Sequence, residues 1–176
     1  MNDPQRKFAR LLSFFTLLAA IAMPLTAVGI WLFWDHLAPI AAGNLSEEYN
    51  LSGLSTVERL AGFSISMVGA LIQAYGYLGL RQTFREAAVG RALSELSIRG
   101  FRRFAWITLI SVLVGVIQRT LWIVIFSISD ATQDGRIDIQ LGSGELKALF
   151  VGLLLVFVAH VFVEGKRAKD ENESFI

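Results

Sequence analysis

The chain has 176 residues, of which 54% are hydrophobic and 18% charged, and its formal net charge is +1. Soluble domains carry about 25% charged residues, so this composition argues against an ordinary soluble domain and favours a membrane protein. Cysteine is absent, which excludes disulfides, a thiol nucleophile and thiolate metal sites.

The first apolar segment follows a basic start. Residues 1–10 contain three Lys or Arg, and the 24 residues 11–34 contain no charge. A helix of this length crosses a hydrocarbon core of about 30 Å. Pro24 is a possible kink, and Trp31 and Trp34 suit an aromatic belt at the far interface. A cleaved signal peptide is the competing interpretation, although its apolar region is usually only about 7–15 residues long.

The segment from Asp35 to Arg59 is predicted to be an outer loop, followed by a second span over 60–80. Ser55 and Glu58 have the spacing of a capping box, so a helix should begin near Thr56. Within the span, small residues recur at seven-residue spacing: Gly62, Gly69 and Gly76. This pattern predicts close packing of a neighbouring helix, and a substrate path along the same groove is the alternative.

Residues 81–103 form the second predicted cytoplasmic segment, with six arginines against two glutamates. Gly90 marks a turn, and Ser94 can cap a helix that continues into the third span, over 104–128. Three interpretations of the segment stay open. It can supply topogenic charge and contact anionic headgroups, lie on the membrane as an amphipathic stretch, or dock a cytoplasmic partner.

The last third of the chain contains a second outer loop, a fourth span over 146–165 and a tail over 166–176. Asp134 and Gly135 favour a turn or short hairpin. The same loop partly resembles an EF-hand, but Leu141 stands where a bidentate Glu is needed, which argues against tight calcium binding. The polar tail is predicted to be either a helical extension or a disordered end.

Positive charge is unevenly distributed between the predicted loops. The three segments assigned to the inside carry twelve Lys or Arg, and the outer segments carry three. The positive-inside rule therefore predicts that both chain ends are cytoplasmic. The expected fold is a single all-α membrane domain, 1–176, with four transmembrane helices.

Polar residues inside the spans form a candidate intramembrane network. Arginine at the bilayer centre costs about 2.5–3.5 kcal/mol on insertion scales, so Arg119 should snorkel outward or pair with a carboxylate. It can also serve an anion site or a gating pair. The candidate network consists of Gln73, Gln118, Arg119 and Glu145.

No catalytic, cofactor or metal site is predicted. His160 and Glu164 share a helix face, but two ligands are too few for a metal site. The sequence contains no P-loop, dinucleotide fingerprint or HExxH motif, and its basic segment lacks a recognisable DNA-binding motif. We therefore expect a non-enzymatic protein without direct nucleic-acid binding.

The end of the chain resembles the YoaS-like proteins, a bacterial membrane family of unknown function. The similar run is Phe162-Val163-Glu164-Gly165-Lys166-Arg167-Ala168-Lys169-Asp170-Glu171-Asn172-Glu173, although Ala168 and Ser174 replace the larger apolar residues usual there. The Gly90-x-x-Leu93-Ser94 entry and Arg102-Arg103-Phe104 are also similar. The resemblance implies four spans in a bacterial cytoplasmic (inner) membrane. Members are often encoded beside a small helix-turn-helix regulator, which suggests a membrane sensor or tether.

The function expected from the sequence is a sensor or tether for such a regulator. Its candidate interaction surface is cytoplasmic: Arg99, Arg102, Arg103, Glu164, Glu171 and Glu173. The alternative is a small transporter or channel subunit built around Gln73, Gln118 and Arg119, and a lipid-modifying enzyme is a third possibility. The expected partners are the lipid bilayer, a cytoplasmic regulator and further copies of the chain.

Overall fold

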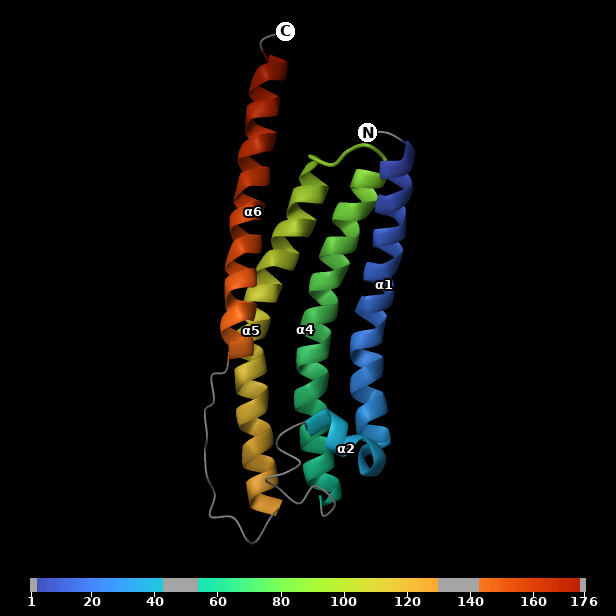
Figure 1. The fold of residues 1–176 in the computed structure, drawn as a ribbon, viewed down its shortest axis with the longest axis vertical. Helices are drawn as coiled ribbons and strands as arrows, with labels where there is room; N and C mark the ends of the chain where they lie inside the picture. The colour runs from blue at the N-terminus through green and yellow to red at the C-terminus, as the bar shows by residue number, and fades with distance from the viewer. Residues whose placement is uncertain (1–2, 43–53, 130–142, 175–176) are drawn as a thin grey trace.

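The computed structural model describes residues 3–42, 54–129 and 143–174, and these residues are helical apart from short connections (Figure 1). The helices are α1 (Asp3–Leu32), α2 (Trp34–Ala42), α4 (Thr56–Ala88), α5 (Glu95–Ser129) and α6 (Ser143–Ser174). All except α2 are long and apolar enough to cross a bilayer. The predicted all-α, four-span fold is therefore confirmed. Each long helix extends beyond its predicted apolar span.

The long helices lie side by side in the order α1, α4, α5, α6, and each packs mainly on its neighbour in this row (Figure 1). The start of α1 and the end of α6 lie at the same end of the bundle, at the top of Figure 1. This placement agrees with the orientation expected from the charge distribution. Following that expectation, we call this end the cytoplasmic end and the opposite one the outer end.

An aromatic cluster lies at the outer end of the helices. Two predictions about this region were wrong. The chain is not a loop from Asp35 onward, because residues 34–42 form α2, which lies across the outer end of the helices (Figure 1). Trp31 and Trp34 do not form an exposed belt: their rings stack with centroids 4.3 Å apart, and Trp34 is only 1% exposed. The indole Nε1 of Trp31 donates a hydrogen bond to Ser66 Oγ at 3.0 Å. Aromatic burial and this hydrogen bond hold the rings inside the protein.

Helix α4 is positioned by its cap and by its glycines. The predicted capping box is present, with the Ser55 side chain accepting from Glu58 N–H and the Glu58 carboxylate accepting from Ser55 N–H. A Cβ at Gly62 would overlap the Trp31 ring, and one at Gly69 would overlap the Gln118 amide. The predicted close packing along the glycine face is confirmed.

The predicted cytoplasmic segment 81–103 is not a separate helix but is divided between the end of α4 and the start of α5. Helix α4 runs through it to Ala88, and α5 begins at Glu95. Between them Gly90 has φ +83°, a conformation that glycine adopts without strain. Ser94 accepts a hydrogen bond from Ser97 N–H, as predicted for a helix cap.

Helix α6 is shifted toward the cytoplasmic end relative to the other three long helices (Figure 1). It begins beside the middle of α5 and extends past the cytoplasmic ends of α1, α4 and α5. Gly152 packs on Leu109, and the Phe162 and Phe101 rings lie 5.0 Å apart. Of the two alternatives for the tail, the structure has the helical extension, to Ser174. The predicted hairpin or partial EF-hand at 130–142 lies outside the described residues.

Candidate functional site at the cytoplasmic end

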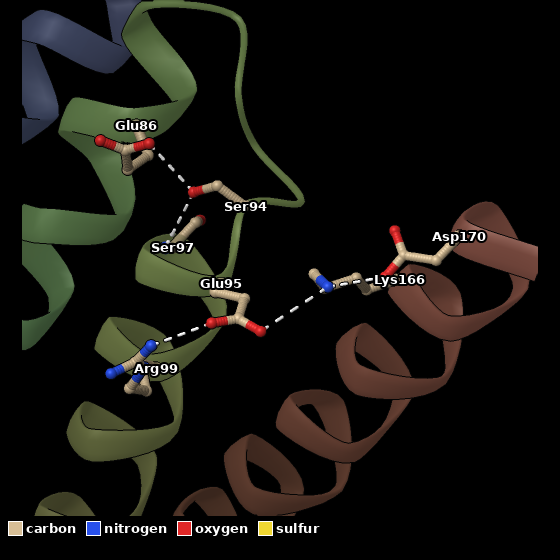
Figure 2. A network of polar contacts seen from close by, with 7 residues as sticks. All are labelled: Glu86, Ser94, Glu95, Ser97, Arg99, Lys166 and Asp170. Atoms are coloured by element: carbon tan, nitrogen blue, oxygen red, sulfur yellow. Dashed lines mark hydrogen bonds and ion pairs between the residues drawn. The ribbon is translucent and has the colours of Figure 1, made fainter. Parts of the chain in front are cut away.

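Glu86 joins the end of α4 to the start of α5. Its carboxylate accepts hydrogen bonds from Ser94 Oγ at 3.0 Å and from Arg91 Nε at 3.0 Å, and Figure 2 shows the Ser94 contact. The Ser94 hydrogen bond, together with Arg91, holds the pKa of Glu86 below its ordinary value. The contact joins the last turn of α4 to the residue that precedes α5.

Glu95 connects α5 to α6, as Figure 2 shows. One of its oxygens lies 3.0 Å from Arg99 Nη2, and the other lies 3.9 Å from Lys166 Nζ. Lys166 also donates to Asp170 at 2.7 Å, one turn further along α6. That hydrogen bond raises the pKa of Lys166 above its ordinary value. Side chains of α5 and α6 thus form one charged network outside the apolar spans.

A groove of about 600 Å³ lies between α5 and α6 at this network. We call it the α5–α6 groove. Ile98 and Val163 supply apolar contact area, and charged side chains of both signs supply the remaining lining. The full set is Glu95, Ile98, Arg99, Arg102, Val163, Lys166, Arg167, Asp170 and Glu171. Mixed charge around an apolar centre is a typical lining for binding an amphipathic protein segment.

The structure brings together part of the predicted cytoplasmic surface. Arg99, Arg102 and Glu171 line the α5–α6 groove, whereas Arg103 points into a different pocket, between α4 and α5. Glu164 is exposed and does not pair with an inner arginine within the described part of the chain. The side chain of Glu173 lies outside the described residues.

Several groove residues were missed by sequence reasoning. On the sequence alone, three of them, Lys166, Arg167 and Asp170, belong to a polar tail without a specific role. Their spacing nevertheless indicates a helix. Lys166 pairs with Asp170 and Arg167 with Glu171, both four residues apart on one helix. Such pairs favour a continued helix, which is what turns the tail into a groove wall.

The candidate intramembrane network divides into separate sites. The Gln118 amide donates a hydrogen bond to the Ile65 carbonyl at 2.9 Å and fills the space over Gly69. Gln73 lines a cavity of about 120 Å³ with Thr108 and Ser111, and neither Gln118 nor Arg119 is in its lining. Gln118 therefore has a packing role between α4 and α5, and Gln73 is not part of a continuous path with it.

Arg119 and Glu145 lie at similar depth because of the α6 shift. Gly152 of α6 contacts Leu109 of α5, so these two residues lie at the same level. Glu145 lies two turns, ~10 Å, outward from Gly152 along α6, and the same distance outward from Leu109 along α5 reaches Val116. Arg119 is about one turn further along α5. Neither residue is without an interaction partner in the structure. The placement keeps an Arg119–Glu145 pair as a prediction.

The helix face carrying His160 and Glu164 offers little coordination chemistry. His160 Nδ1 lies 3.3 Å from the Val156 carbonyl of its own helix. Within residues 3–42, 54–129 and 143–174 there is no group of three His, Asp or Glu that could hold a metal ion.

Comparisons of the chain with protein-family models, curated proteins and solved structures find no match. The resemblance to the YoaS-like family remains a prediction. What the fold establishes is the class: a multi-pass, all-helical membrane protein with a charged groove outside its apolar spans.

Proposed function

We propose that the protein is a non-enzymatic tether in a bacterial inner membrane, which docks a cytoplasmic regulator in the α5–α6 groove. The observation that carries the proposal is the extension of α6. Its last turns stand beyond the other helices (Figure 1). Arg167 and Glu171, in the same part of α6, line the groove. A soluble partner can reach these residues without entering the bilayer.

The chemistry of the groove suggests the kind of partner. An amphipathic helix can place an apolar side chain on Val163, which is 38% exposed beside the largely buried Ile98, and its charged side chains against both signs of charge on the rim. A small helix-turn-helix regulator supplies such helices. The resemblance to the YoaS-like family, whose members are often encoded beside one, supports this choice.

The transporter alternative receives less support from the geometry. Its three residues do not line one cavity, because Gln118 is hydrogen-bonded between α4 and α5 away from the cavity at Gln73. A path would have to be built by further copies of the chain.

The test is site-specific photocrosslinking in native membranes of the source bacterium. A photoreactive residue at Glu171 should give an adduct with a soluble helical regulator, and one at Phe150 on the same helix should not, since Phe150 is 67% exposed outside the groove. Charge reversal at Arg167 should weaken the adduct, whereas reversal at Lys147 should leave it unchanged. Adducts only with lipid or with the chain itself at Glu171 would overturn the tether.

A further inference from the structure

A second pocket, of about 480 Å³, opens between α4 and α5 at the cytoplasmic end. Its lining contains three arginines and no carboxylate, unlike the mixed lining of the α5–α6 groove. We call it the arginine pocket and define it by Tyr75, Gln82, Leu96, Arg99, Arg102, Arg103 and Trp106. Its position at the basic boundary of the spans places it at the level of lipid headgroups.

Arg103 is held in place but has unused hydrogen-bonding capacity. Its guanidinium carbon lies 4.5 Å from the centre of the Tyr75 ring, a cation–π arrangement. Its Nε is buried and has no hydrogen-bond partner among the described residues. The Nε lies against Gly79, so a ligand would accept from the terminal nitrogens of Arg103, which form no hydrogen bond or ion pair within the described part of the chain.

The other two arginines are available to an anion. Arg102 forms no ion pair or hydrogen bond within the described part of the chain. Arg99 pairs with Glu95, but both side chains are about two-thirds exposed, so the pair contributes little and can be exchanged. Guanidinium groups match phosphate oxygens in geometry and charge.

The surface beyond the pocket is apolar along two helix faces. On α5, Arg99, Arg103 and Trp106 continue at alternating four- and three-residue spacing into exposed Ile110, Leu113 and Ile117. On α4, Gln82 leads in the same way to Leu78, Tyr75 and Leu71, which are also exposed. Both stripes pass from polar to apolar in the direction from the cytoplasmic end into the membrane.

From this arrangement we infer that the arginine pocket is a binding site for an anionic phospholipid of the cytoplasmic leaflet. The phosphate lies among the guanidinium groups of Arg99, Arg102 and Arg103, and the acyl chains follow the apolar stripes of α4 and α5. Trp106, 46% exposed, lies between the two zones, where tryptophan is favoured. A soluble phosphate would satisfy the arginines but leave the apolar stripes unused.

The test uses the full chain in micelles with equal amounts of phosphatidylglycerol and phosphatidylcholine of identical acyl chains. Native mass spectrometry reports the ratio of the two lipid adducts. We expect wild type to retain phosphatidylglycerol selectively, and Arg103→Gln to lower that selectivity about fivefold, the usual effect of one cation near a lipid surface. Arg85→Gln is the matched control, because Arg85 is an exposed cytoplasmic arginine outside the pocket lining.

A second variant protects the test against misfolding. Arg102→Gln removes an exposed cation from the same pocket, and helicity by circular dichroism should stay at the wild-type level. Equal retention of both lipids would overturn the inference, as would an equal loss in Arg85→Gln. Displacement of phosphatidylglycerol by millimolar inorganic phosphate would also overturn it, because the site would then select a small soluble anion. These outcomes do not depend on a protein partner in the α5–α6 groove.

Discussion

Helices α1, α4 and α5 contrast with α6 in how they meet their neighbours. Along α4, side chains or backbone of the adjacent helices occupy the space where glycine lacks a Cβ: Trp31 at Gly62, Gln118 at Gly69, Ile107 at Gly76 and the Gly100 carbonyl at Gly79. Helix α6 has a single such position, Gly152 on Leu109, among its described glycines. Contacts at several glycines hold the first three helices together, whereas α6 has one such contact, with Leu109 Cα, beside an aromatic contact and an ionic network.

This difference assigns stability to the packing of α1, α4 and α5, and partner recognition to the charged end of α6. In a bilayer, lipid chains are as apolar as leucine, so tight packing of small residues rather than apolar area holds helices together. The α1–α4–α5 unit uses that packing at Gly62, Gly69, Gly76 and Gly79. Helix α6 has little packing of small residues, and its cytoplasmic end is therefore available to line a groove of charged residues.

The largest expected loss of stability is at the contact between Gly79 and Gly100, where the backbones of α4 and α5 meet. A Cβ at Gly79 would lie 2.6 Å from the Gly100 carbonyl oxygen. Because backbone cannot rotate away, Gly79→Ala must separate α4 from α5, and we expect a loss of about 1–3 kcal/mol in the free energy of unfolding. Unfolding in mixed micelles, followed by circular dichroism, measures it.

The control for this change lies in α6. Nothing lies within 4 Å of a Cβ built at Gly165, so Gly165→Ala should be neutral or slightly stabilising. Equal losses in the two variants would remove the distinction between the two regions.

The sequence predicts the tightly packed region better than the shifted helix. Uncharged runs, the Ser55–Glu58 box and the glycine spacing are local patterns, and each one is present in the structure. The register of α6 on α5 depends on tertiary contacts such as Phe101 with Phe162, which no local pattern encodes. For the same reason the α5–α6 groove was predicted only in part, through Arg99, Arg102 and Glu171.

The aromatic residues at the outer end show a second limit. Trp31 and Trp34 are amphipathic, and their position near the end of a span fits both an interfacial belt and a buried stack. Only the packing of both rings in the aromatic cluster and the hydrogen bond to Ser66 decide between the two. Helix α2 itself lies among loop-forming residues and contains Pro39, so periodicity gave no signal for it.

A smaller effect is expected from the shifted register of α6. If Glu145 pairs with Arg119 at their common depth, Arg119→Gln and Glu145→Gln should not be additive. We expect a coupling energy of about 1 kcal/mol in a double-mutant cycle of unfolding free energies. Arg119→Gln combined with Lys147→Gln is the control. Additive losses in the Arg119–Glu145 cycle would show that Arg119 snorkels to the outer interface instead.

The smallest expected effect is a change of local stability with pH, which differs between the Glu86–Ser94 contact and the Lys166–Asp170 contact. The pKa of Glu86 is lowered in the folded state, chiefly by Ser94, so its contribution is present above the unfolded pKa and is lost as pH falls through the folded value. The pKa of Lys166 is raised, chiefly by Asp170, so its contribution is present below the unfolded pKa and is lost as pH rises through the folded value. Acid should therefore loosen the α4–α5 turn, and alkali should loosen the α6 extension.

Hydrogen exchange measures the acid effect at a defined amide. The Ser97 N–H donates to Ser94 Oγ, whose position depends on the Glu86 carboxylate. Protection of this amide should fall in wild type as pH drops below the ordinary carboxyl pKa, after correction for intrinsic exchange rates. In Glu86→Gln the protection should be lower at neutral pH and should no longer depend on pH over this range. An unchanged acid dependence in Glu86→Gln would assign the effect to another carboxylate and leave the turn fixed by Gly90 and its backbone hydrogen bonds alone.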